Sequence, residues 1–257
     1  MLGLGLRDRF NSSRFGGKAR RLYRSTLSPE FRSIAKTSDE ILATIPRAKF
    51  EAIRNRYLVD DPSAEGARIV HTSSRKYLDA QHWVENAVER AVAVDLDARP
   101  PLSVLDLGCG AGWFLYVARH FGHRPIGLDL GDNRMYNELV ELLSLERVVH
   151  CIDPFVPLPD FGRKFDLITG YMVYFNFFNF GKGDARAWGP KEWHFFLDNV
   201  RKVLLPGGHL RLELNRGGFY LPPDERGVYL TDETAAGICS IRGVSVSATK
   251  GVVTLDN

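Results

Sequence analysis

From Leu102 onward, short apolar stretches with the length of buried strands alternate with stretches of helical periodicity. The strand-like stretches are LSVLDL (102–107), PIGLDL (125–130), VVHCID (148–153), FDLIT (165–169) and HLRLELN (209–215). Strands that alternate with helices indicate a parallel sheet with helices on both faces. The tail, ICSIRGVSVSATKGVVTLD (238–256), has the pattern of an antiparallel hairpin at one sheet edge. The sequence therefore predicts an α/β protein with a doubly wound, mostly parallel sheet.

The stretches between the predicted strands have the spacing of amphipathic helices. We expect helices over about 113–121, 132–145 and 190–205, the last beginning at Pro190, a residue that suits a first helical turn. A further helix is expected before the first strand, over about 74–94. These helices would cover the two faces of the sheet.

The front of the chain is basic. Residues 1–58 contain 13 Lys and Arg against 5 Asp and Glu, and the turn-rich stretch DDPSAEG (60–66) follows. We therefore expect a basic N-terminal extension over 1–66 and a ligand-binding domain over 67–257. Charge runs of this kind usually form solvated helices. The alternatives are a surface for anionic lipid, a surface for nucleic acid and an organelle transit peptide.

Composition indicates a globular chain without a membrane-spanning segment. Of the 257 residues, 44% are hydrophobic, yet no run approaches the length of a membrane span. The three cysteines, Cys109, Cys151 and Cys239, form no CxxC pair, so neither a zinc site nor a disulfide framework is indicated, and no metal is expected. These features predict a cytoplasmic protein, either soluble or peripheral at a membrane surface.

The stretch VLDLGCGAGWF (104–114) is typical of a buried strand that leads through a glycine-rich turn into a helix. Such a turn lets backbone N–H groups and a helix N-terminus approach a ligand closely. In a dinucleotide fingerprint the third glycine would fall at position 113, which is tryptophan here. This departure argues against a nicotinamide dehydrogenase. The spacing Gly108, Gly110, Gly112 better suits a nucleoside that carries a compact cationic amino acid.

From about residue 100 to 257, the chain resembles the class I S-adenosylmethionine-dependent methyltransferases. Five motifs agree in order: Asp106–Gly112, Asp129 at the end of the second strand, Asp153 followed by Leu158-Pro159, Phe165–Ile168, and Leu205–Gly208. One glycine motif is weak support, whereas five in register are hard to obtain by chance. The resemblance implies a Rossmann-like fold with a seven-stranded sheet and S-adenosyl-L-methionine as the cofactor.

The resemblance also assigns roles around the cofactor. Gly108 and Gly110 would offer backbone to its methionine end, with Cys109 between them as a small residue of the turn. Asp106 and the carbonyl of Gly170, just past the fourth strand, would lie near its amino group. Asp129 would accept both ribose hydroxyls, since a carboxylate can satisfy two adjacent donors. Leu130 is a further cofactor-binding candidate, and Asp153 would accept the adenine amino group. Pro154 departs from many relatives because it has no N–H to offer the base.

The acceptor side is expected in YMVYFNFFNF (171–180), which follows the fourth predicted strand at the edge where such folds bind ligands. Tyr171, Tyr174, Trp188 and Trp193 are candidates to line an apolar pocket. The alternative is a hydrophobic cluster beneath the basic arm. Relatives that methylate DNA bases carry an Asn/Asp-Pro-Pro-aromatic run where Thr169–Met172 stands, so DNA-base methylation is disfavoured.

A general base is not evident from the sequence. His194 is a weak candidate, because it falls on the polar stripe of its predicted helix and is more readily explained as a surface histidine. The sequence thus predicts a methyltransferase for a small-molecule or glycan-like acceptor, with transfer to oxygen. The alternatives are a methyltransferase for tRNA or another nucleic acid, and a non-catalytic cofactor-binding partner subunit.

Overall fold

The computed structural model describes residues 29–58, 75–178, 186–215, 230–247 and 251–257. The chain divides into two compact units, Met1–Ala98 and Arg99–Asn257. The domain boundary expected near residue 66 and most of the basic arm lie outside the described residues. No helix within the described ranges is long and apolar enough to cross a membrane.

The first unit contains four described helical segments: α2 (Pro29–Ala43), α3 (Arg47–Leu58), the 3-10 helix η2 (Arg75–Leu78) and α5 (Ala80–Val92). Helix α2 packs against α5, and α3 against η2. The single helix expected over 74–94 is interrupted at Asp79, whose side chain accepts a hydrogen bond from the N–H of His82 at 3.3 Å. Asp79 thereby caps α5 and separates it from η2.

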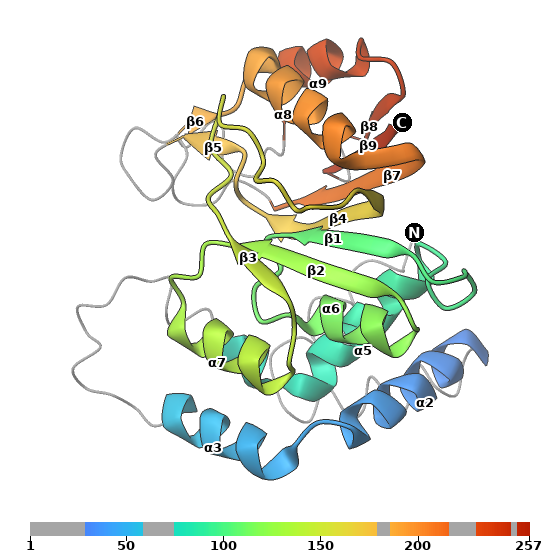
Figure 1. Cartoon of the computed structure of the whole chain (residues 1–257), viewed down its shortest axis with the longest axis vertical. Coiled ribbons are helices and arrows are strands. Elements are labelled where there is room, and N and C mark those ends of the chain that lie inside the picture. The colour runs from blue at the N-terminus through green and yellow to red at the C-terminus, as the bar shows by residue number, and fades with distance from the viewer. Residues whose placement is uncertain (1–28, 59–74, 179–185, 216–229, 248–250) are drawn as a thin grey trace, which may run out of the picture. The chain divides into compact units, whose positions relative to one another are not determined.

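The second unit is built on one seven-stranded sheet of the order β3-β2-β1-β4-β7-β9-β8 (Figure 1). Its first five strands are parallel, and β9 and β8 form the antiparallel hairpin expected at the edge. The strands are β1 (Ser103–Leu107), β2 (Arg124–Asp129), β3 (Arg147–Val149), β4 (Phe165–Val173), β7 (Leu204–Leu214), β8 (Val244–Ser247) and β9 (Val252–Asp256). The predicted doubly wound, Rossmann-like sheet is confirmed.

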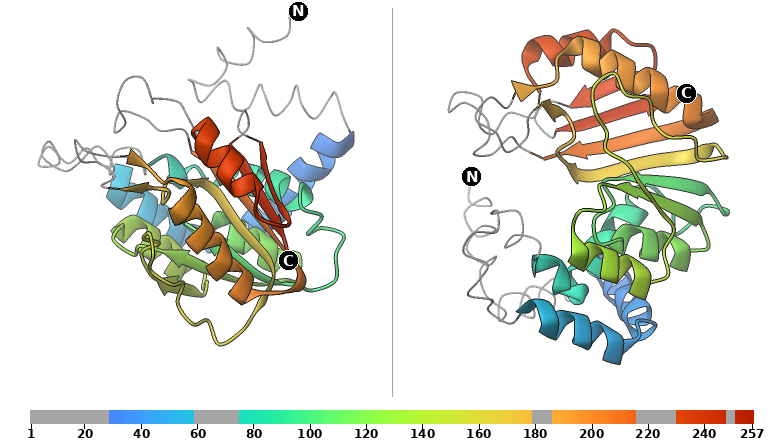
Figure 2. Two further views of the ribbon diagram at one scale, coloured as in Figure 1. Left: turned by 90° about the horizontal axis from the view of Figure 1, so that it is seen from above. Right: turned by 60° about the vertical axis from the view of Figure 1, so that its left-hand side comes forward.

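Helices cover both faces of this sheet (Figure 2). They are α6 (Trp113–His120), α7 (Arg134–Leu142), α8 (Pro190–Val203) and α9 (Asp232–Cys239). The chain steps from β1 to β2 and β3 in one direction along the sheet and from β4 to β7 in the other. Right-handed crossovers therefore place α6 and α7 on one face and α8 on the opposite face. The step reverses between β1 and β4, which is where ligands bind in folds of this type.

Several element boundaries differ from the prediction. Strand β3 stops at Val149 instead of 153, because it is an edge strand paired on one side only. Central β4, paired on both sides, runs on to Val173. Gly170 therefore lies within this strand and not past it. Helix α9 was not predicted, and its last two residues lie in the stretch expected to form the hairpin.

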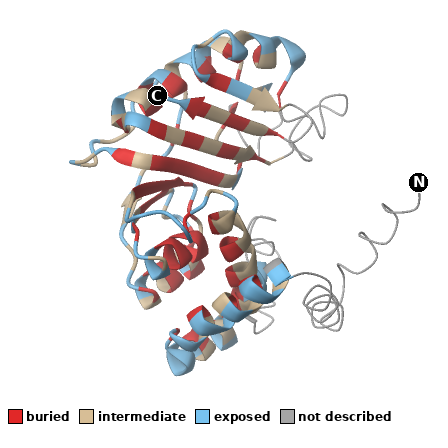
Figure 3. Ribbon diagram, turned by 90° about the vertical axis from the view of Figure 1, so that its right-hand side faces the viewer, coloured by how far each residue is buried: buried red, intermediate tan, exposed pale blue. Residues whose placement is uncertain are grey.

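The core of the second unit lies between the sheet and its helices. Along β7, buried residues alternate with half-buried ones from Gly208 to Leu214 (Figure 3). The leucines at 210, 212 and 214 are at most 2% exposed and belong to the main core cluster. This alternation follows from strand geometry, in which successive side chains point to opposite faces.

Candidate functional site

The glycine turn is tied to the end of the neighbouring strand. The N–H groups of Gly108 and Cys109 both donate to the carbonyl oxygen of Leu128, at 2.7 and 3.2 Å. Gly108 and Gly110 have φ of 69° and 53°, a left-handed conformation that favours glycine. A Cβ on Gly108 would lie 3.0 Å from Cγ1 of Val173, so the turn also packs closely against the end of β4.

Asp129 joins this turn to the end of β2. One of its carboxylate oxygens, Oδ2, accepts the N–H of Gly110 at 2.7 Å, and the other, Oδ1, accepts the N–H of Leu130 at 2.8 Å. Burial raises the pKa of Asp129, against the lowering effect of these two N–H groups and of Arg147. A carboxylate oxygen can accept two hydrogen bonds, so each oxygen retains capacity for a ligand hydroxyl.

Asp106 lies directly before the turn, at the end of β1. It is 4% exposed, and its Oδ1 accepts the hydroxyl of Thr169 at 2.8 Å. The two residues are paired in register on adjacent strands β1 and β4. Sequence reasoning missed Thr169 as a site residue, because its role depends on which strands are neighbours in the sheet.

Cys109 serves as a small buried residue of the turn. Burial, together with the charges of Asp129 and Asp106, raises the pKa of its thiol well above the ordinary value. Its Sγ occupies the space above Gly127, where an added Cβ would lie only 2.5 Å away. A thiol in these surroundings stays protonated at neutral pH and is a poor nucleophile.

Exposed apolar side chains lie beyond Asp129, on the side expected to hold adenine. Leu130 is 51% exposed and Val149 is 62% exposed, at the carboxyl ends of neighbouring strands β2 and β3. Asp153 is also exposed, and its carboxylate accepts a hydrogen bond from the Cys151 thiol. Burial and this acid raise the pKa of Cys151 to about 11. The arrangement provides an apolar surface with one acidic group beside it.

The four candidate pocket residues separate into two pairs. Tyr171 and Tyr174 are half-buried on or just after β4. Trp188 and Trp193, in contrast, are 1% and 0% exposed. Their rings pack edge to face within the hydrophobic core, with 5.8 Å between the ring centroids. Their assignment to the wall of an open pocket is therefore corrected: in this structure the two indoles are core residues.

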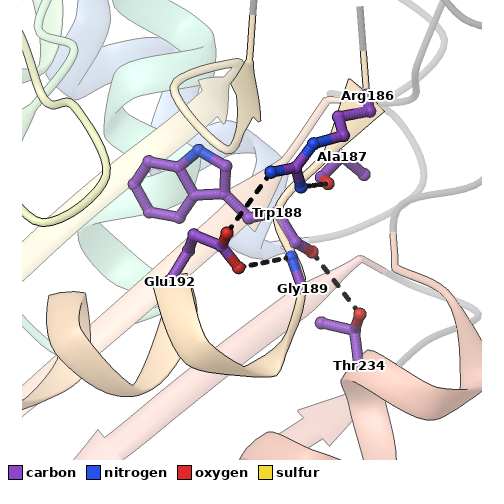
Figure 4. Close-up of polar contacts among 6 residues, drawn as sticks. All are labelled: Arg186, Ala187, Trp188, Gly189, Glu192 and Thr234. Carbon is purple, nitrogen blue, oxygen red and sulfur yellow. Dashed lines mark hydrogen bonds and ion pairs between the residues drawn. The ribbon is translucent and has the colours of Figure 1, made fainter.

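A small polar network fixes the start of α8 beside Trp188 (Figure 4). The buried carboxylate of Glu192 accepts the N–H of Gly189 at 3.0 Å and forms an ion pair with Arg186 at 3.5 Å. The hydroxyl of Thr234, on α9, donates to the carbonyl oxygen of Trp188 at 3.4 Å. These contacts hold the connection from the two-stranded β5–β6 sheet (Phe177–Phe178, Arg186–Ala187) into α8.

His194 is exposed on α8, and its side chain contacts the backbone of α9. Its Nε2 lies 3.2 Å from the carbonyl oxygen of Gly237. No hydrogen bond joins it to the glycine turn among the residues that the structure describes. The same part of the chain contains no group of three or more His, Cys, Asp or Glu side chains that could hold a metal ion.

Comparison with known proteins finds similarity at the level of structure alone. No protein-family model and no curated protein sequence matches the chain. Solved structures that are similar include DesVI from Streptomyces venezuelae (19% identity, TM-score 0.42, 60% of this chain and 61% of that one). CalS10, an amino pentose methyltransferase from Micromonospora echinaspora, shows 22% identity and a TM-score of 0.41 over 62% of this chain and 58% of its own. The glycopeptide N-methyltransferase MtfA shows 16% identity and a TM-score of 0.37, over 53% and 55% of the two chains. The chain thus spans less than two thirds of the length of each of these proteins.

Proposed function

We propose that the protein is a class I S-adenosylmethionine-dependent methyltransferase that acts on a small-molecule or glycan-like acceptor, with transfer to oxygen. The main support is the hydrogen bond between Asp129 and Gly110, which brings together the two motifs expected to hold the cofactor. They meet at the carboxyl ends of β1 and β2, next to the point where the strand order reverses.

Each part of the site has a role in this proposal. The turn Gly108–Gly110 offers backbone to the methionine end, Asp129 accepts the ribose hydroxyls, and Leu130 with Val149 covers the apolar faces of the base. When bound, the cofactor supplies an electrophilic methyl group on a sulfonium. The protein then has to align the acceptor and exclude water. The end of β4, with Tyr171 and Tyr174 half-buried, is the proposed acceptor side.

The cofactor assignment is tested by calorimetric titration with S-adenosylmethionine and with NAD. We expect only the sulfonium compound to bind. Asp129→Ala should weaken its binding by about 1.5 to 3 kcal/mol, the usual value of a hydrogen bond to a charged group. Asp132→Ala is the matched control, since Asp132 is an exposed acid in the same turn, and its affinity should stay close to that of the wild type. Equal losses in the two variants, or tighter binding of NAD, would contradict the proposal.

The acceptor class is tested by transfer of labelled methyl groups from the cofactor to fractionated small molecules, glycans and tRNA. We expect label in the first two fractions, on an oxygen atom. Label in tRNA, with strong salt dependence of binding, would favour a nucleic-acid acceptor instead. Cofactor binding without formation of S-adenosylhomocysteine in any fraction would favour a non-catalytic binding subunit.

A further inference from the structure

Arg147 is the first residue of β3, the strand that pairs with β2 and its last residue, Asp129. It pairs in register with Gly127, two residues before Asp129 on the adjacent strand. Because side chains alternate along strands, Gly127, Asp129 and Arg147 face the same side of the sheet. That side also carries the Cys109 thiol, which fills the space above Gly127.

The Arg147 guanidinium is connected to the turn that follows Asp129. Its Nη2 donates to Oδ1 of Asn137 on α7 at 2.6 Å. The Nδ2 of Asn137 in turn donates to the carbonyl oxygen of Gly131 at 2.9 Å. Asn137 therefore links a half-buried arginine on β3 to the backbone two residues beyond the carboxylate of Asp129.

Part of the guanidinium is buried without a protein partner. The Nη1 atom is inaccessible to solvent and has no hydrogen-bond acceptor among the described residues. A buried polar atom without a hydrogen-bond partner is unfavourable for stability. Packing alone therefore does not account for the way this guanidinium group is placed.

We propose that Arg147, oriented by Asn137, is a positioning residue of the ribose site, which holds the turn after β2 next to the Asp129 carboxylate. This proposal rests on the proposed function only where it concerns the ligand. Arg147 touches no reacting atom and acts through Asp129. Its effect on that acid can be measured in the free protein.

The charges around Asp129 determine the direction of the effect. Burial raises the pKa of Asp129, and so does the nearby acid Asp132, whereas Arg147 lowers it. From β1 and its turn, Asp106 and the Cys109 thiol face the same cluster. Removal of the Arg147 charge should therefore raise the pKa of Asp129 further. A protonated carboxyl is a weaker acceptor, so ribose binding should then fail at a higher pH than in the wild type.

The first measurement is the titration of the Asp129 carboxyl carbon by NMR in the ligand-free protein. We expect the midpoint to rise in Arg147→Met, because an opposite charge that favours the ionised carboxylate is lost. Arg147→Lys, which keeps the charge, should titrate close to the wild type. Arg134→Met is the matched control: it removes an exposed arginine of α7 that pairs with Glu138, and it should leave the midpoint unchanged.

The second measurement is the affinity for S-adenosylhomocysteine from acid to neutral pH. As the pH is lowered, the affinity of Arg147→Met should begin to fall at a higher pH than that of the wild type. The size of this shift should match the shift of the Asp129 midpoint measured by NMR. Asn137→Ala, which retains the arginine, should shift both midpoints in the same direction but less, and it supplies the test if Arg147→Met does not fold.

The two measurements separate the possible failures. An unchanged Asp129 midpoint in the folded charge-removing variant would overturn the role of Arg147. An affinity that falls equally at every pH would show that Arg147 is only structural. Absence of S-adenosylhomocysteine binding in all proteins, the wild type included, would refute the proposed function, while the NMR titration would still decide the effect of Arg147 on Asp129.

Discussion

At the scale of single residues, aromatic side chains that follow β4 look alike in the sequence but differ in how deeply they are buried. The sequence from 171 to 193 is rich in aromatic residues, among them Tyr174, Phe175, Trp188 and Trp193. The structure leaves Tyr174 half-buried and encloses both tryptophans in the core. The sequence could not distinguish the two cases, because the rings that pack on the indoles come from two separate segments, Phe175 after β4 and Phe196 on α8.

Asn176 lies in this aromatic cluster and is 0% exposed. Neither Oδ1 nor Nδ2 of its side chain has a hydrogen-bond partner among the described residues. A buried polar group without a partner costs about 1 to 3 kcal/mol. We therefore expect Asn176→Leu, a substitution of similar volume, to raise the free energy of unfolding by about that amount in urea denaturation.

The matched control for Asn176 is the other buried asparagine at a turn, Asn133. Its side chain caps α7 by accepting the N–H of Tyr136 at 3.2 Å. Asn133→Ala should destabilise the protein by about 1 kcal/mol through loss of this cap. If Asn176→Leu destabilised the protein to the same extent, the amide of Asn176 would have a partner that the structure does not show.

At the scale of elements, the end of β4 departs most from regular geometry. The register with β7 shifts between Tyr171 and Val173, and Met172, the residue between them, has φ of 59° and is 48% exposed. A bulky residue in the left-handed region is strained, and β-bulges often re-aim side chains next to functional sites. Asn215 at the end of β7 supports the bulge, since its N–H donates to the carbonyl oxygen of Val173 at 3.0 Å.

This strain can be relieved by substitution. Met172→Gly should stabilise the protein by about 0.5 to 1 kcal/mol, because the relief of left-handed strain exceeds the entropy that glycine loses on folding. Thermal unfolding measures the change. Met172→Ala retains a Cβ and hence the strain, so it should give no gain. A gain of the same size in both variants would place its origin in the exposed apolar side chain and not in the backbone.

At the scale of the whole molecule, the alternation of strands and helices predicted the doubly wound sheet and its antiparallel edge. The motifs also placed Asp106, Gly110 and Asp129 at strand ends that the structure brings together. Contacts between distant elements were not readable from local pattern. The hydrogen bond from Thr169 to Asp106 depends on which strands are adjacent in the sheet. The hydrogen bonds that join Asn137 to Arg147 and to Gly131 depend on where α7 packs. The capping of α5 at Asp79 was missed because apolar periodicity continues across it.

The hydrogen bond from Gly110 to Asp129 has a consequence for how a ligand is received. Both oxygens of this acid accept backbone N–H groups of the chain itself, so the arrangement of the turn around Asp129 needs no contact from a ligand. The Gly110 amide should therefore resist exchange with deuterated solvent even without cofactor, and lose that protection in Asp129→Ala but not in Asp132→Ala. Rapid exchange in the wild type would instead mean that the ligand itself shapes the turn. A preorganised binding site loses little binding free energy to ordering of the chain, which would favour tight binding of the proposed ligand.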